Sequence, residues 1–520
     1  MKRNINANRK TRLKATFWNG VLLVVLLIGG YITKNAYNAY ISGQIGKIHP
    51  SFSYSNEFRL ANIYHHGAGK HSNVHMVLDI NDDIRKLASD HYQLNAASAE
   101  EPENDLWSSY ADFQDTNPFN YSFKLKTTTA PVTRTSNRDP NFISSFLDYS
   151  LTNPEMAAKV EFEWEDEDVL APDVTDRTTV MSLALMSSNA YVKLPQTGNW
   201  RNLTGWNITD EKGAPEYGWE EDGIRGHVFV NQNESVVVFA IKGTSSQILP
   251  GSGNDETSVN DKLNDNLLFS CCCARVTYLW TTVCDCYMKA YTCNEKCLEN
   301  ELRRRDYYYY AVMEMYKDIV MSYPNATIWL TGHSLGGALG SLLGRTFGLP
   351  AVTFQSPGEQ LATKRLHLPQ RPGIPSYKEA IWHFGHTADP IFMGTCNGAS
   401  SACSIGGYAM ETGCHTGKVC VYDVVADKGW HVSIMNHRIH TVIDNVILEY
   451  DTVPSCVDPG KCEDCYNWDF VRDEETASPK LSPSPEVTTT GYTGASPTKR
   501  CVGRNWIGIC TSYEPVLSKI

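Results

Sequence analysis

The segment Gly332-His-Ser-Leu-Gly-Gly337, a G-x-S-x-G pattern, constrains the fold of this chain more than any other feature. Residues 326–331 before it are apolar, β-branched and aromatic, which predicts a buried strand. Residues 335–347 after it lack proline and carry leucines among small residues, which predicts a helix packed closely on a sheet. A sharp turn between such a strand and such a helix, called the elbow below, would expose the Ser334 hydroxyl as a nucleophile.

Two further residue types follow the elbow in the order that a nucleophile of this kind requires, first an acid and then a histidine. Asp389 lies in the loop after a strand-like segment and is the expected acid, with Asp423 as the alternative. His437 lies near the start of a helical segment and is the expected base. His440 is the alternative base, because histidines three residues apart on a helix share a face.

An attack by Ser334 on a carbonyl would also need donors for the oxyanion that develops. The backbone N–H of Leu335, directly after the nucleophile, is the first expected donor. Residues 227–242 predict a β-hairpin, and Thr244 in the following turn is the expected second donor. A turn that merely closes the loop is the alternative interpretation of Thr244. The chemistry requires no metal ion and no organic cofactor, and none is expected.

Together these motifs resemble the class 3, fungal lipase-like family of α/β-hydrolases. The resemblance rests on the local sequences around Thr244, Ser334, Asp389 and His437. It narrows to the vacuolar lipases of yeasts that break down autophagic bodies, on four longer strings: Cys271–Cys286, Leu342–Pro350, His383–Cys396 and Cys501–Trp506.

This resemblance covers roughly residues 55–470 and the last dozen residues. It implies an α/β-hydrolase fold of the class 3 lipases, with Ser334 as nucleophile, Asp389 as acid and His437 as base. It also implies that the chain hydrolyses acyl esters of glycerolipids, both neutral lipids and phospholipids, and so lyses autophagic bodies and multivesicular-body vesicles inside the vacuole.

The amino terminus has the pattern of a membrane anchor. Residues 1–16 carry six basic side chains and no acidic one, and residues 17–33 are almost wholly apolar. We expect an uncleaved transmembrane signal anchor at 17–33 rather than a cleaved signal peptide, because no small-residue cleavage site follows it. The basic tail would stay cytosolic, which makes the chain a single-pass type II membrane protein with a lumenal body. The resemblance implies passage from the endoplasmic reticulum through the multivesicular body, or prevacuolar endosome, to the vacuole lumen.

Two further features agree with a lumenal body. All 16 cysteines lie from Cys271 onward, and they favour disulfides over zinc ligation, because Cys462-x-x-Cys465 is the single C-x-x-C unit. Five N-x-S/T sequons follow the predicted anchor and predict N-glycosylation at Asn120, Asn202, Asn207, Asn233 and Asn325.

Beyond the tail and the anchor, composition divides the chain into four further parts. We expect an amino-terminal lumenal extension at 55–173, an α/β-hydrolase domain at 174–470, a Ser/Thr/Pro-rich linker at 474–500 and a Cys-closed segment at 501–520.

The net charge of −12 argues against nucleic acid as a partner and against simple electrostatic attraction to anionic lipid. Access to lipid must therefore come from an apolar surface. The segment after Thr244 is first rich in Gly, Ser, Asn and Asp and then apolar at 267–269 and 276–283, which predicts a mobile lid. A disulfide-stapled insertion in the core is the alternative interpretation.

Three classes of function stay open at this point. A membrane-anchored lipase or phospholipase explains the largest number of the motifs described above. A thioesterase or acyltransferase would use the same elbow, because this chemistry specifies the nucleophile and not the acceptor. A non-catalytic lumenal glycoprotein could keep the fold for tethering.

Overall fold

The computed structural model describes most of the chain from residue 57 onward. The described ranges are 57–98, 119–157, 159–192, 200–203, 223–245, 257–276, 280–375, 378–472, 499–504 and 510–515. The predicted tail and signal anchor, most of the predicted linker and the Asn207 sequon lie outside them. Within these ranges, no helix combines the length and the apolar character needed to span a membrane.

Eleven strands of the described residues form one mixed β-sheet. Ten of them follow one another across it as β15 (Cys456–Val457), β14 (Lys418–Tyr422), β13 (Ile381–His386), β12 (Ala351–Phe354), β11 (Thr327–His333), β8 (Val236–Ile241), β7 (Gly223–Asn231), β1 (Glu57–Gly67), β2 (His75–Asp79) and β6 (Arg201–Asn202). The eleventh, β3 (Phe123–Lys124), pairs with β1. From β8 to β14 neighbouring strands are parallel, and the other pairs are antiparallel. Parallel strands are covered on both faces, which explains why all six residues of β8 are apolar and buried.

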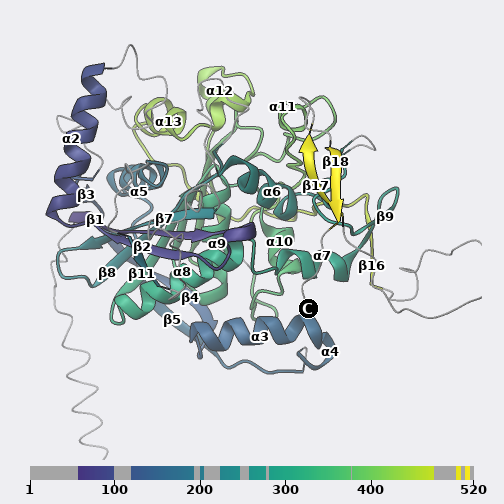
Figure 1. Cartoon of the computed structure of the whole chain (residues 1–520). Coiled ribbons are helices and arrows are strands. Elements are labelled where there is room, and N and C mark those ends of the chain that lie inside the picture. Colours follow the sequence, from purple (N-terminus) through teal and green to yellow (C-terminus); the bar gives the residue numbers. More distant parts are fainter. Residues whose placement is uncertain are drawn as a thin grey trace, which may run out of the picture. The chain divides into compact units, whose positions relative to one another are not determined.

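Helices α5 (Arg177–Asn189) and α9 (Leu335–Phe347) cover opposite faces of the parallel strands (Figure 1). Successive strand residues point to opposite faces. Accordingly, the Thr331 hydroxyl of β11 lies 3.0 Å from the Ser187 hydroxyl of α5, whereas a Cβ on Gly332 would lie 2.5 Å from the backbone of Gly336 in α9. The predicted α/β architecture and the expected close backbone approach at the elbow are both confirmed.

Other helices extend these two layers. Helix α8 (Tyr308–Ser322) packs against α9, and α13 (Ile439–Val442), continued by the π-helical turn η4 (Ile443–Ile447), packs against α5. The smaller elements around them are α10 (Gln360–Arg365), α11 (Ala402–Ile405), α12 (Val424–Lys428), η1 (Gly69–His71) and η3 (Ile434–His437).

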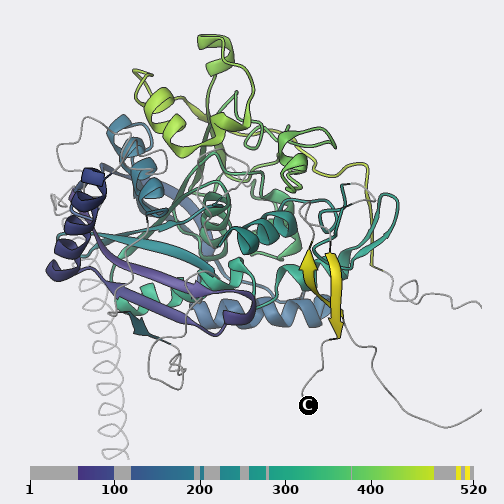
Figure 2. The same ribbon diagram turned by 45° about the horizontal axis from the view of Figure 1, so that its top comes forward.

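The predicted amino-terminal extension contributes to the same sheet as the residues after 173. Figure 2 shows its strands β1 and β2, in purple, beside the teal strands β7 and β8. The rest of the extension contains α2 (Asp82–Ser98), the two-stranded ribbon of β4 (Thr127–Thr135) and β5 (Trp164–Pro172), and the helices α3 (Pro140–Thr152) and α4 (Pro154–Ala157).

Among the described residues, seven disulfides staple the part of the chain after residue 270, which confirms the preference for disulfides over zinc ligation at these cysteines. They join Cys271–Cys465, Cys272–Cys293, Cys273–Cys284, Cys286–Cys297, Cys396–Cys403, Cys414–Cys462 and Cys420–Cys456. The stapled region holds α7 (Glu295–Leu302) and a small sheet of β9 (Tyr287–Lys289), β10 (Thr292–Asn294) and β16 (Asp469–Val471).

One described part of the predicted lid, residues 267–269, is packed into the core. Helix α6 (Ser258–Leu268) ends in Leu267 and Leu268, which are buried together with Phe269, and three disulfide-bonded cysteines follow at once. At these three residues the structure favours the alternative of a stapled insertion, and a lid formed by the rest of the segment stays a prediction. Apolar residues are expected both in a lid and in a core insertion, so composition alone cannot distinguish the two.

The closing segment contains a short antiparallel pair, β17 (Lys499–Arg504) and β18 (Cys510–Pro515). Its two cysteines are Cys501 and Cys510. Closure of this segment by a disulfide stays a prediction.

Candidate active site

The elbow places Ser334 between β11 and α9, with φ of 56° and ψ of −129°. A non-glycine residue rarely adopts this backbone conformation, and the strain turns the side chain out of both elements. Glycine is required at the neighbouring position 336, because a Cβ there would lie 2.1 Å from the Ile241 carbonyl oxygen at the end of β8. The elbow is therefore packed directly against the end of the neighbouring strand.

A continuous hydrogen-bond chain links Ser334, His437 and Asp389. The Asp389 carboxylate lies 2.7 Å from His437 Nδ1, and Ser334 Oγ lies 2.8 Å from His437 Nε2. A carboxylate accepts, so Nδ1 carries the proton and Nε2 is left to accept the serine proton. The other oxygen of Asp389 accepts from the Ile391 N–H at 2.9 Å, which fixes the carboxylate. The structure thus brings together the three residues expected from the sequence.

All three side chains are largely withdrawn from water. Ser334 is 6% exposed, His437 is 7% exposed and Asp389 is fully buried. Hydrogen bonds and ion pairs are stronger in such a setting than in water. Ser334 and His437 each keep a small exposed surface, and a substrate carbonyl could reach them there.

Two histidines that the sequence reasoning did not single out hold the backbone around the base. His333 Nε2 lies 2.7 Å from the His437 carbonyl oxygen, and His386 Nε2 lies 3.0 Å from the Asn436 carbonyl oxygen. A carbonyl only accepts, so both Nε2 atoms donate. His333 Nδ1 then accepts from the Tyr191 hydroxyl at 2.9 Å.

Burial favours the neutral form of both of these histidines. Burial, together with the neighbouring His437, lowers the pKa of His333 well below its usual value. Burial also lowers the pKa of His386, although Asp389 opposes it. Neutral rings of fixed tautomer suit a supporting role. The only sequence signal for His333 was its place in the elbow pattern.

The turn that carries Thr244 is fixed to α6. The Thr244 hydroxyl donates to Asp265 at 2.7 Å, and the Ser245 N–H donates to Asp261 at 2.8 Å. Lys242 pairs with the same Asp261 at 3.1 Å, and both side chains are buried. The turn also touches the elbow, because a Cβ on Gly243 would lie 2.2 Å from the His333 carbonyl oxygen. The contacts keep Thr244 beside the elbow, where the second oxyanion donor was expected.

Leu335 is the first residue of α9. The first N–H groups of a helix have no partner within the helix, so that of Leu335 is available to an oxyanion. The oxyanion roles of Leu335 and Thr244 are taken up below as part of a proposal.

The alternative residues hold other positions. Asp423 is the N-cap of α12, where it accepts from the Ala426 N–H at 3.1 Å and from the Thr387 hydroxyl at 3.0 Å. His440 lies in α13, and burial lowers its pKa to about 4. The helical segment begins after His437 rather than before it, because His437 is the last residue of the 3-10 turn η3.

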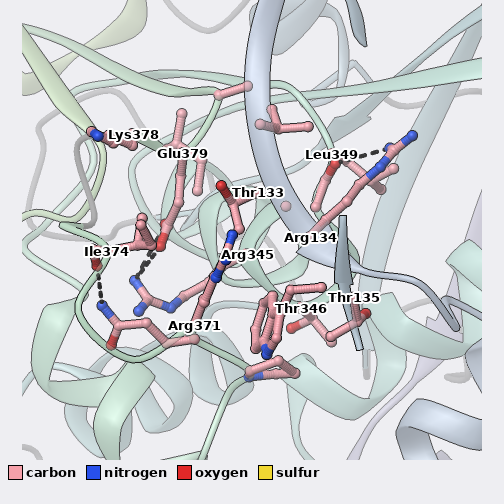
Figure 3. Close-up of a pocket in the computed structure, with 18 residues that line it drawn as sticks. Thr133, Arg134, Thr135, Arg345, Thr346, Leu349, Arg371, Ile374, Lys378 and Glu379 are labelled. Atoms are coloured by element: carbon pink, nitrogen blue, oxygen red, sulfur yellow. Dashed lines mark hydrogen bonds and ion pairs between the residues drawn. The ribbon is translucent and has the colours of Figure 1, made fainter. Parts of the chain in front are cut away.

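The enclosed pocket in Figure 3 is separate from these residues. Its lining comes from β4, the end of α9 and residues 369–381, and it includes the ion pair of Arg345 with Glu379 at 3.2 Å. None of Ser334, His437 and Asp389 lines it. Its volume is about 30 Å³, whereas ligand pockets usually measure roughly 300–1,000 Å³. It is too small for a lipid chain.

The described sequons lie on the surface or close to it. Asn120, Asn233 and Asn325 are exposed, and Asn202 is partly exposed in β6. Such positions are accessible to a glycosyltransferase. Glycosylation at all five sequons stays a prediction.

Comparison with known proteins agrees with this arrangement. Residues 255–348, which include the elbow, match the family model described as Lipase (class 3). A protein of Eremothecium gossypii named "Putative lipase ATG15" is 53% identical over 97% of this chain and 93% of its own length. A protein of the same name from Saccharomyces cerevisiae is 56% identical over 88% of this chain and 89% of its own length.

The solved Lip2 lipase of Yarrowia lipolytica is 16% identical over 40% of this chain and 63% of its own, with a TM-score of 0.21, a likeness too low to add to the assignment. The two yeast relatives are similar over almost their whole length, and that similarity decides the family. The chain therefore belongs to the class 3 lipase family and is a lipase, a carboxylic ester hydrolase.

Proposed function

We propose that this lipase cleaves acyl esters with Ser334 as nucleophile, His437 as base and Asp389 as the residue that orients it. His437 removes the hydroxyl proton as Ser334 attacks the ester carbonyl, and the Leu335 and Thr244 N–H groups stabilise the oxyanion. His437 then protonates the leaving alcohol, and an acyl-enzyme forms. Water, activated by the same histidine, releases the fatty acid.

One observation carries this proposal. The distances of 2.8 Å from Ser334 to His437 and 2.7 Å from His437 to Asp389 lie within hydrogen-bond reach. The order of the three residues along the chain, serine, acid and histidine, is that of other α/β-hydrolases. Side chains alone carry the proton and the acyl group, so the scheme requires neither a metal ion nor an organic cofactor.

We further propose that the substrates are glycerolipids of membranes inside the vacuole, phospholipids included. The name ATG15 of the relatives links them to autophagy. The basic tail at 1–16, the apolar segment at 17–33 and the five sequons support a type II membrane protein that travels from the endoplasmic reticulum through multivesicular bodies to the vacuole. Autophagic bodies and multivesicular-body vesicles would be lysed there.

The test uses the full-length chain purified in detergent, with Ser334→Ala as the matched control. Both proteins are incubated with vesicles of mixed phospholipid and triacylglycerol, and the lipids are followed by mass spectrometry. We expect free fatty acids and lysophospholipids with the wild-type chain and none with Ser334→Ala. Equal release by both proteins contradicts the assignment of Ser334.

The other classes of function are separate outcomes of the same preparation. A fluorophosphonate probe should label the wild-type chain and spare Ser334→Ala. A wild-type chain that is not labelled indicates a non-catalytic protein. A labelled chain that moves acyl groups onto an added alcohol, or cleaves thioesters while leaving vesicle lipids intact, indicates an acyltransferase or a thioesterase.

A further inference from the structure

Three buried side chains outside the Ser334–His437–Asp389 chain point polar atoms at one another. Glu359 lies directly before α10, His383 lies in β13 and His415 lies in the loop before β14. Glu359 and His383 are fully buried, and His415 is 5% exposed. One ligand atom from each lies within 4.8 Å of the other two. Neighbouring parallel strands thus bring together residues that are 24 and 32 positions apart in sequence.

Three polar atoms of this group make no hydrogen bond of good geometry among the described residues, although the Glu359 carboxylate lies near both rings. The three atoms are Glu359 Oε2, His383 Nε2 and His415 Nδ1. The other Glu359 oxygen, Oε1, accepts from the Ser341 hydroxyl at 3.0 Å and from the Thr416 N–H at 2.9 Å. Buried polar atoms are normally hydrogen-bonded, so three in one place that are not call for a physical cause.

A hydrogen bond on the far side of each ring orients that ring, and the one made by His415 also sets its tautomer. His415 Nε2 lies 3.1 Å from the Phe392 carbonyl oxygen, and His383 Nδ1 lies 2.8 Å from the Thr353 hydroxyl. Because the carbonyl only accepts, Nε2 of His415 carries a proton, and Nδ1 of the neutral ring is a bare lone pair aimed at Glu359. Histidine ligands of metals are oriented in this way by a partner on the other ring nitrogen.

The separations suit a shared cation better than direct hydrogen bonds. Glu359 Oε1 lies 3.4 Å from His383 Nε2, and Glu359 Oε2 lies 3.4 Å from His415 Nδ1. A charge-assisted N–H···O bond measures about 2.7–2.9 Å. Two ligand atoms at the usual Zn–N and Zn–O distances on a tetrahedral ion are about 3.3 Å apart.

We propose that Glu359, His383 and His415 form a buried binding site for one divalent transition-metal ion, of which Zn²⁺ fits the ligands best. Two imidazoles and one carboxylate are a known zinc ligand set, and water completes the coordination. The seven disulfides explain why the cysteines take no part.

The site braces the loop that carries Asp389. Phe392 lies three residues after Asp389, and its carbonyl accepts from His415. The side-chain rings of Phe392 and His415 are 4.8 Å apart. Disulfide Cys414–Cys462 holds the residue before His415, and the Ser341 hydroxyl of α9 reaches Glu359. A bound ion therefore ties α9, β13 and the Asp389 loop together, and its role is structural.

The test measures metal content and stability rather than activity. The full-length chain is produced in zinc-supplemented medium, passed through gel filtration and analysed by plasma mass spectrometry. We expect about one zinc ion per chain, and a fall in Tm of about 2–4 °C when a strong chelator removes it. Added Zn²⁺ should restore the Tm, and Co²⁺ in its place should give the visible absorption of a tetrahedral site.

The variants His415→Gln and His383→Gln should bind the metal at least about tenfold more weakly. The exposed His431 provides the matched control, because His431→Gln removes an imidazole and should keep the ion. A wild-type chain that holds no stoichiometric metal overturns the proposal and leaves the two histidines in contact with Glu359 alone. Retention of the metal by His415→Gln overturns it as well. The wild-type measurement decides even if a variant fails to fold.

Discussion

His333 Nε2 lies 2.7 Å from the backbone carbonyl oxygen of His437, so the residue before the nucleophile holds the backbone of the base. The two rings lie 4.9 Å apart. The elbow therefore presents Ser334 and also helps to set where His437 Nε2 lies. A positioning contact of this kind acts on the rate of the chemical step, because it touches no part of the substrate.

Replacing His333 by Phe should lower kcat by about 10- to 100-fold, because a displacement of the base by a fraction of an ångström is costly in rate. KM on a soluble short-chain ester should stay close to the wild-type value. His333→Gln keeps a donor and should recover part of the loss. Steady-state kinetics check this, with His431→Gln as control. A change in KM alone would assign His333 to substrate binding instead.

Asp389→Asn should lower kcat on the order of 10⁴-fold with little loss of stability. One side-chain oxygen must still accept from the Ile391 N–H, which turns the amide NH₂ toward His437 Nδ1. The proton then moves to Nε2, and the ring can no longer accept the serine proton. Asp423→Asn is the matched control and should keep nearly full activity. The opposite ranking of these two variants contradicts the assignment of Asp389.

Ser334→Gly should be more stable than Ser334→Ala by about 1 kcal/mol, although both are inactive. The φ of 56° and ψ of −129° strain every residue with a Cβ, and glycine relieves that strain at a smaller entropic cost. Thermal unfolding of the two variants measures the difference. Equal Tm values would mean that the elbow adds no strain at this position.

Local elements and the order of the motifs could be predicted from the sequence, because short-range patterns determine them. Residues 326–331 and 335–347 became β11 and α9 with boundaries shifted by two residues or fewer. The chain order that predicted Asp389 and His437 relies on the topology shared by hydrolases of this fold. Their catalytic roles remain a proposal until the variants are measured.

What could not be predicted depends on contacts between distant segments. No local pattern relates His386 to the Asn436 carbonyl or Glu359 to His383, because each pair joins a residue of β13 to a segment distant in sequence. The open choice between a lid and a stapled insertion at Leu267 and Leu268 has the same cause. Their apolar character fits a cover or a core, and the disulfides that decide between the two cannot be paired from sequence.

The fold should lose stability as the pH rises from about 4 to about 8, because of Asp265 on α6. Burial raises the pKa of Asp265 to about 8, against the opposing effect of the Thr244 hydroxyl that donates to it. In the unfolded chain an aspartate has a pKa of about 4. Between these values the folded chain holds a proton that the unfolded chain releases.

This contribution is therefore fully present below about pH 4 and is lost as the pH rises to about 8, by up to about 1.4 kcal/mol per pH unit. Asp265→Asn keeps an acceptor for Thr244 and should flatten the dependence. Denaturant unfolding across that range measures it, with the exposed Asp458 changed to Asn as control. If Asp265→Asn keeps the wild-type slope, another group is responsible, and the turn that holds Thr244 is not the pH-sensitive part of the site.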